Sequence, residues 1–204
     1  MIKVEHIDVH GFEAAIRGMR NPHDSWDKSD SGYFFNTGDY YVGANDLDLM
    51  QRLAKAGTEH RKYLRMITVT MDITAPLYWW KEFDTYKVGT VANSCSTMHK
   101  IHSKEFIIDD FSCQHLNRTG TPILWDVIET LNFCRQQYLE TKDKQWWWQM
   151  IQLLPSSYNQ KRTVMMNYET VFNIIKQRSG HKLDEWNEFV DVLTGLPYVK
   201  ELKS

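Results

Sequence analysis

Apolar and polar residues change their spacing several times along the chain, and each change marks a predicted element. Residues 2–9 alternate between apolar and polar side chains, which predicts a strand, and residues 66–73 alternate most clearly of all. Apolar residues recur at helical spacing over 12–19. A second helix is expected between an Asn45 N-cap and Gly57, which would end it.

Helical spacing dominates the rest of the chain. One predicted helix begins at Pro76, and four more cover residues 122–138, 146–155, 168–178 and 184–196. Residues 33–42 and 164–166 are expected to be extended, and Asp109 or Asp110 is expected to cap a short helix. Many helices and few strands, with no repeat and no low-complexity linker, predict a single α+β domain over residues 1–204.

The composition narrows the classes of protein to which the chain can belong. Its 204 residues carry a net charge of −2, and Lys and Arg form no long basic block, so duplex nucleic acid is not expected as the main partner. No apolar run approaches the roughly 20 residues of a membrane span, and nothing at the N-terminus resembles a signal peptide. Three Cys residues fit reduced thiols, so we expect a cytoplasmic protein.

One group of Cys and His residues resembles a metal site at first sight. The group consists of Cys95, His99, His102, Cys113 and His115. The spacing Cys-x3-His-x2-His fits no standard zinc pattern, because no second ligand pair of known form follows it. We therefore predict no metal site.

Residues 75–96 combine a run of large aromatic side chains with charged and small polar ones. Lys81, Lys87, Asn93 and Ser96 all lie within this segment. A segment that only filled a core would not need these polar groups, and a segment that only faced water would not need the aromatic rings. The combination is typical of a pocket that stacks a flat ring and holds an anion.

Three separate pieces of the sequence together resemble the flavin-dependent thymidylate synthases. The first is Glu59-His60, and the second is the aromatic segment 75–96, which stands where that family has its Arg-His-Arg-x7-Ser signature. The third is Leu153-Leu154-Pro155-x-x-Tyr158, followed by Asn167-x5-Asn173-x4-Arg178 and His181. The pieces follow the family's order, so the resemblance implies the family's fold, which is α+β with a small, mostly antiparallel sheet and flanking helices.

The resemblance also implies roles for particular residues. Arg178 would bind the phosphate of a nucleotide. Further contacts to the substrate would come from Lys81, Glu82, Lys87 and Asn93. The FAD cofactor would be contacted by Glu59, His60, Asn167 and Asn173. The position of the family's active-site Ser is held by Ser96 or, in an alignment without an insertion, by Cys95.

Several of these residues also have a purely structural interpretation. Arg178 ends a predicted helix, where the helix dipole favours a cation, and Asn167 could cap the start of that helix. Lys81 and Lys87 could be solvated side chains on a helix face. Cys95 could be a small buried apolar residue.

The departures from the family pattern mostly remove cations. Thr85-Tyr86-Lys87 stands in place of Arg-His-Arg, Glu169 in place of the Arg of Asn-x-Arg, and Ile151 in place of the Arg before Leu-Pro. A nucleotide phosphate is held mainly by charge-assisted bonds, each worth about 1.5–3 kcal/mol. We therefore expect a divergent member of the family with changed anchoring of its ligands.

For activity, the resemblance implies reductive methylation of dUMP with FAD and methylene-tetrahydrofolate, in a homotetramer whose sites lie between subunits. Two alternatives stay open: an enzyme that modifies another pyrimidine nucleotide, and a nucleotide-binding protein that has lost the flavin and its chemistry. The lost cations favour the alternatives. The retained Asn167, Asn173 and Arg178 favour a nucleotide or flavin site of some kind.

Overall fold

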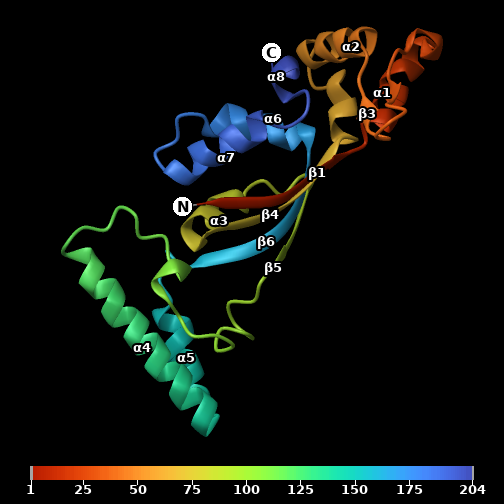
Figure 1. Ribbon diagram of the computed structural model, residues 1–204. Helices are drawn as coiled ribbons and strands as arrows, with labels where there is room; N and C mark the ends of the chain where they lie inside the picture. Colours follow the sequence, from red (N-terminus) through yellow and green to blue (C-terminus); the bar gives the residue numbers. More distant parts are fainter. Residues whose placement is uncertain (1, 204) are drawn as a thin grey trace. The chain divides into compact units, whose positions relative to one another are not determined.

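The computed structural model describes residues 2–203, and its elements confirm the predicted α+β class (Figure 1). The α-helices are α1 (Phe12–Arg20), α2 (Ala44–Lys55), α3 (Leu77–Phe83), α4 (Gly120–Thr141), α5 (Lys144–Leu153), α6 (Tyr168–Arg178), α7 (Asp184–Thr194) and α8 (Val199–Leu202). The strands are β1 (Lys3–His10), β2 (Gly32–Tyr33), β3 (Tyr40–Tyr41), β4 (Thr68–Pro76), β5 (Thr90–Ser94) and β6 (Asn159–Asn167). Two of the 3₁₀ helices matter below, η3 (Arg61–Arg65) and η4 (Ile108–Asp110). None of the helices within residues 2–203 has the length and apolar character that a membrane span requires.

Four strands form one sheet in the order β1-β4-β6-β5, and β2 pairs with β3 as a separate antiparallel hairpin. Leu77 N donates a hydrogen bond to Tyr158 O (3.0 Å). Tyr168 N donates to Ile67 O (2.9 Å). Residue numbers thus rise along β4 as they fall along β6, so the two strands are antiparallel. Burial alternates along β4 as the sequence predicted, although the strand extends to Pro76.

Strand β5 is absent from the sequence-based prediction, which treated its residues as a loop. It pairs antiparallel with β6, because Asn167 N donates to Gly89 O (3.1 Å) and Cys95 N donates to Lys161 O (2.9 Å). β5 lies at the sheet edge and all but its first residue are exposed. A strand without a buried face leaves no apolar alternation in the sequence, which explains why it was missed.

One of the predicted helix caps is wrong, at Asn45, and one is confirmed, because Asp110 caps η4 from the last position of that helix. Asn45 lies inside α2, and the carboxylate of Asp30 accepts hydrogen bonds from Asn45 N (2.9 Å) and Asp46 N (3.1 Å). In η4, Asp110 lies at the end of the short helix and accepts a hydrogen bond from Ile107 N (3.1 Å). Caps supplied from elsewhere in the chain cannot be recognised from the residue that precedes a helix.

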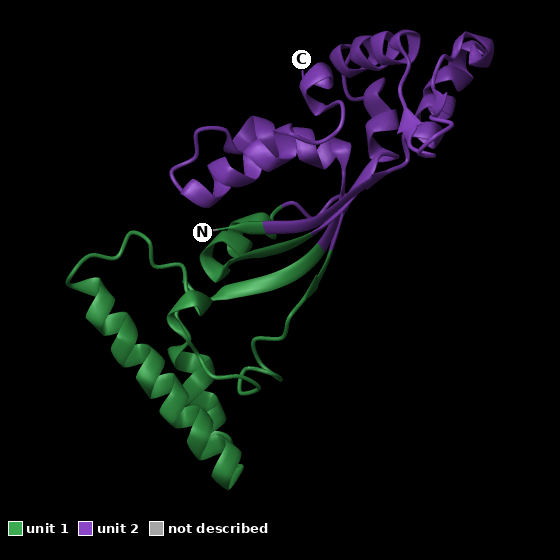
Figure 2. Cartoon of the chain, viewed as in Figure 1, with its two compact units in different colours: residues 1–3, 72–85, 92–163 green, residues 4–71, 86–91, 164–204 purple. Residues whose placement is uncertain are grey.

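The chain divides into two compact units (Figure 2). Unit 1 comprises residues 1–3, 72–85 and 92–163, and unit 2 comprises residues 4–71, 86–91 and 164–204. In unit 1, α4 packs against α5, and the short helix α3 buries Trp79, Trp80 and Phe83. In unit 2, α6 packs against α7 and buries its apolar face. The single domain over residues 1–204 stays a prediction.

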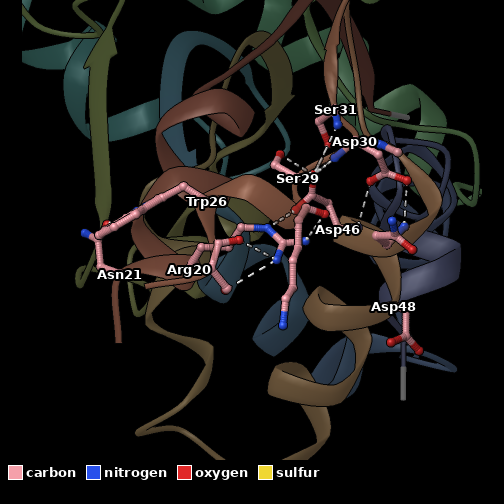
Figure 3. Close-up of polar contacts among 12 residues, drawn as sticks. Arg20, Asn21, Trp26, Ser29, Asp30, Ser31, Asp46 and Asp48 are labelled. Atoms are coloured by element: carbon pink, nitrogen blue, oxygen red, sulfur yellow. Dashed lines mark hydrogen bonds and ion pairs between the residues drawn. The ribbon is translucent and has the colours of Figure 1, made fainter. Parts of the chain in front are cut away.

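A buried ion pair between Arg20 and Asp46 organises unit 2 around the loop that follows α1 (Figure 3). Arg20 Nε donates to Asp46 Oδ1 (2.6 Å), and the Asp46 side chain has no exposed surface. The other oxygen of Asp46 accepts hydrogen bonds from the hydroxyl groups of Ser29 (2.7 Å) and Ser31 (2.6 Å). The remaining nitrogens of Arg20 donate to the backbone oxygens of Ser25 and Lys28. Each nitrogen of the guanidinium and each oxygen of the carboxylate thus has a hydrogen-bond partner within the chain.

These contacts decide the charge of Asp46. Burial alone would raise the pKa of this carboxyl, but the hydrogen bonds from Ser31 and Ser29 and the adjacent Arg20 guanidinium lower its pKa below the ordinary value of 3.8. Because the folded pKa is lowered, the carboxylate stabilises the fold at pH values above the ordinary pKa. That stabilisation is lost as the pH falls through the lowered folded pKa.

Asp46→Asn is expected to reduce the free energy of unfolding by about 3 kcal/mol at neutral pH, because it leaves the Arg20 charge buried without its partner. Urea unfolding at a series of pH values measures this. The difference from the wild type should shrink in acid, where Asp46 itself becomes protonated.

The matched control is Asp48→Asn, two residues further along α2 on its exposed side (Figure 3). Asp48 pairs with Arg52 at the surface, and its side chain is 63% exposed. We expect its loss to be barely measurable. Equal losses of stability for both variants would contradict the role given to the Arg20–Asp46 pair.

Candidate functional site

Arg178 ends helix α6 and is held in a fixed position by its neighbours in unit 2. Its Nε donates a hydrogen bond to the Tyr86 hydroxyl (2.9 Å), and its Nη1 lies 3.2 Å from His181 Nε2. The guanidinium carbon lies 4.5 Å from the centroid of the Trp186 ring and 5.6 Å from that of Tyr86. The cation is therefore oriented by two aromatic rings as well as by hydrogen bonds.

The loop that carries Tyr86 and Lys87 is fastened along α6. The Tyr86 hydroxyl donates to Gln177 Oε1 (3.0 Å), near the end of the helix. Near its start, the Thr170 hydroxyl donates to Val88 O (2.9 Å). The side chain of Lys87 itself is exposed. The residues that stand in place of the family's His and second Arg are thus placed by α6.

Gly89 is required where this loop meets α6. Its φ of +74° lies in the left-handed region, and a Cβ there would lie 2.2 Å from Asn167 Nδ2. Asn167 Oδ1 in turn accepts a hydrogen bond from Thr170 N (2.9 Å), so Asn167 caps α6. The cap interpretation of Asn167 is confirmed, and its contact with a flavin stays a prediction.

Glu59 and His60 lie in an exposed turn before η3 and line a hollow of about 250 Å³ in unit 2. Pro22 and His23, from the loop after α1, also line this hollow. Asn173 is exposed on α6 and lines a different hollow of the same unit. Within unit 2, the four residues predicted to contact FAD therefore do not gather around one space.

Glu169, which stands where the family resemblance predicts an Arg, is hydrogen-bonded to two guanidinium groups. It accepts hydrogen bonds from Arg65 Nε (2.5 Å) and Arg61 Nε (3.3 Å), both on η3. The bond from Arg65 is the main reason that the pKa of Glu169 lies below its ordinary value, against the opposing effect of its partial burial. The lost cation on α6 is thus accompanied by two cations on a neighbouring element.

In unit 1, the residues predicted around the family's Ser lie on the edge strand β5 and just after it. Asn93, Cys95 and Ser96 are all exposed, so the interpretation of Cys95 as a buried apolar residue is wrong. Ser96 Oγ accepts hydrogen bonds from the backbone N–H groups of Met98 (3.2 Å) and His99 (2.8 Å) and so forms a turn. On α3, the Lys81 side chain is exposed and Glu82 is half-buried.

Sequence analysis missed Arg162, which fixes the backbone at Cys95. Its guanidinium lies 4.2 Å from the centroid of the Trp80 ring and donates to Asp84 Oδ1 (2.6 Å). Arg162 Nε donates to Gln160 Oε1 (3.0 Å), and Gln160 Nε2 donates to Cys95 O (2.7 Å). Predicting β6 at its full length would have placed Arg162 and Gln160 on the same face of a strand, which is the signal that was available.

No three His, Cys, Asp or Glu side chains among residues 2–203 come together in a way that could hold a metal ion.

The chain was compared with known proteins by sequence and by structure. No protein-family model matches it, and no curated protein matches its sequence. Among solved structures it is similar to the flavin-dependent thymidylate synthase ThyX of Helicobacter pylori complexed with FAD and dUMP, at 16% identity and a TM-score of 0.71, over 98% of both chains. A second structure of that enzyme with FAD and dUMP gives 17% identity and a TM-score of 0.70 over 100% of both chains.

A third similar structure is the UMP/dUMP methylase PolB of Streptomyces cacaoi bound with 5-Br dUMP. It is 12% identical, with a TM-score of 0.64, over 98% of this chain and 93% of the other. The three sequence pieces predicted this fold, and the structural similarity extends it over nearly the whole chain. The chain has the fold of the flavin-dependent thymidylate synthases.

Proposed function

We propose that this protein binds a pyrimidine nucleoside monophosphate and acts on it as a thymidylate-synthase-like enzyme. One observation carries the proposal: the three similar structures belong to two enzymes with different activities, and all three were solved with dUMP or 5-Br dUMP bound. The first candidate reaction is methylation of dUMP with FAD and methylene-tetrahydrofolate. Another pyrimidine nucleotide, such as UMP, is the alternative substrate.

In this proposal Arg178 holds the nucleotide phosphate. Its guanidinium is already oriented by the Tyr86 hydroxyl and the Trp186 ring, so little conformational freedom is lost when an anion binds. Lys87 lies on the loop that α6 fastens through Val88 and adds a second positive charge. A fixed guanidinium with an added point charge suits a phosphate dianion.

Ser96 or Cys95 would face the uracil base, with Asn93, Lys81 and Glu82 as further contacts to the substrate. The backbone at Cys95 is held on both sides, by Lys161 O and by the Gln160 amide. A rigid backbone would place these short side chains against a base without a further ordering cost.

FAD would supply hydride transfer when bound. The hollow lined by Glu59 and His60 measures about 250 Å³, below the roughly 300–1,000 Å³ typical of small-molecule sites. Asn167 caps α6 with its side-chain oxygen, and Asn173 faces another hollow. The residues of unit 2 therefore do not by themselves form a site that fits a flavin, and a second candidate function follows: a pyrimidine-nucleotide-binding protein without flavin chemistry. The carboxylate of Glu169 in place of a cation favours this second candidate.

We also propose that the protein assembles as a homotetramer. Four large apolar side chains on α4 and α5 of unit 1 are at least 44% exposed, namely Ile123, Trp125, Phe133 and Trp148. Of these, Trp125 and Phe133 lie on one side of α4, and large apolar groups exposed on one side of a helix are typical of surfaces covered by a partner. Residues that serve one site can then come from more than one subunit.

Arg178→Ala is expected to weaken dUMP binding by about 1.5–3 kcal/mol, which is roughly 10- to 100-fold. Isothermal titration calorimetry with dUMP and UMP measures this, and Arg178→Lys should lose less because it keeps the charge. Arg17→Ala, which removes a 65% exposed Arg of α1, is the control and should bind as the wild type does. Unchanged affinity in Arg178→Ala would show that Arg178 only ends a helix.

Flavin binding separates the two candidate functions. We expect little flavin absorbance in the purified wild type, and a higher affinity for added FAD after Thr85→Arg and Lys87→Arg are introduced together, because both positions are exposed and regain family cations. Formation of dTMP from dUMP and methylene-tetrahydrofolate is assayed in parallel. If neither protein binds FAD while dUMP still binds, the flavin-dependent reaction is excluded and the binding protein remains.

Light scattering at micromolar concentration tests the assembly. The expected mass is four times the 24.2 kDa of one chain. Trp125→Glu should lower the mass, because it places a charge among the exposed apolar residues. A monomeric wild type would contradict both the assembly and a site shared between subunits.

A further inference from the structure

Unit 2 contains a second hollow that the proposed nucleotide site does not use. It has a volume of about 440 Å³ and is formed by residues of α2, η3, α6 and the C-terminal α8. Its floor is apolar, because Leu64, Ile175 and Leu202 line it and are only 2–3% exposed. Phe172 and Ala54 add further apolar surface. A flat or aliphatic group bound on this floor would be stabilised by the removal of apolar surface from water.

The rim of this hollow is positively charged. Arg61 and Lys176 line it together with the amide of Asn173, and no Asp or Glu does so among the residues described by the structure. Arg61 shares the carboxylate of Glu169 with Arg65, so one negative charge faces two guanidinium groups. Lys176 is exposed and makes no ion pair with any of residues 2–203. Positive charge is therefore in excess around an apolar floor.

The hollow lies away from Arg178 on the same helix. Successive residues of an α-helix are rotated by about 100°, so Lys176 and Arg178 point to nearly opposite sides of α6. The residues around Arg178 are Tyr86, His181 and Trp186, and none of them lines the hollow. A ligand bound in the hollow would not occupy the proposed phosphate position.

We propose that this hollow binds a small organic anion, meaning a phosphate or carboxylate group attached to an aromatic or aliphatic body. The body packs on Leu64, Ile175 and Leu202, and the anionic group is held by Lys176 and Arg61. Apolar burial and charge-assisted bonding thus act on the two ends of one ligand. Asn173, which the family resemblance assigns to FAD, also lines the hollow, but the inference rests on Lys176, Arg61 and the apolar floor and not on the proposed nucleotide function.

Calorimetry with three simple probes tests the site in the full chain. Phenyl phosphate and phenylacetate carry the two anionic groups on the same ring, and inorganic phosphate carries the charge without a body. We expect at least one of the ring-bearing probes to bind saturably at millimolar concentration, and inorganic phosphate to bind at least about tenfold more weakly because it leaves the apolar floor unused. The stronger of the first two identifies the anionic group that the site prefers.

Three single-residue variants test whether the probes bind in this hollow. Lys176→Glu should weaken the ring-bearing probes by about tenfold or more, because it replaces attraction by repulsion at the rim. Ala54→Trp should block them by filling the floor. The matched control is Lys55→Glu, an exposed Lys of α2 that does not line the hollow, and it should bind as the wild type does.

Three results would overturn the proposal. The first is no saturable binding of either ring-bearing probe to the wild type, and the second is unchanged affinity in Lys176→Glu. The third is loss of phenyl phosphate binding in Arg178→Ala with full binding in Lys176→Glu, which would place the anion at the nucleotide site. Thermal unfolding of each variant verifies that it folds. If Ala54→Trp does not fold, Lys176→Glu still tests the proposal, because Lys176 is at the surface.

Discussion

The attachment of the loop Tyr86–Gly89 to helix α6 is the constraint on which the candidate chemistry of unit 2 depends. At one end, Gly89 can approach Asn167 only because it has no side chain and adopts a left-handed conformation. At the other end, the Tyr86 hydroxyl lies between Gln177 and Arg178 and accepts a hydrogen bond from the guanidinium. A change in this loop would therefore move Lys87 and Arg178 together.

The cations of this chain lie on other elements than those that the family resemblance predicts. Where the family resemblance leads one to expect cations, this chain has Tyr86 and Glu169, yet Arg61 and Arg65 come to Glu169 from η3, and Arg162 lies on the Trp80 ring in unit 1. The shape of the backbone is set by apolar burial along β4 and α6, which does not depend on these polar positions. This is why a chain that is 12–17% identical to three solved structures can share their fold.

The sequence predicted the elements that bury one face and missed those that do not. The alternation of apolar and polar residues predicted β4, and apolar residues at helical spacing predicted α6, because the buried residues of such elements recur at a fixed interval in the sequence. The exposed edge strand β5 leaves none. The cap from Asp30 and the pairing of Arg20 with Asp46 connect residues far apart in the chain, so their partners could not be identified from local pattern. For the candidate site, the sequence pointed to Arg178, but its orientation by Trp186 and the role of Arg162 near Cys95 required the structure.

A crystal structure of the protein with dUMP tests the central claim most directly. The account predicts that the nucleotide phosphate lies within hydrogen-bond distance of the Arg178 guanidinium, with Tyr86 still bonded to Arg178 Nε. The account would be contradicted by a nucleotide whose phosphate is held elsewhere. It would also be contradicted by crystals that take up no dUMP at concentrations well above the dissociation constant of a typical enzyme site.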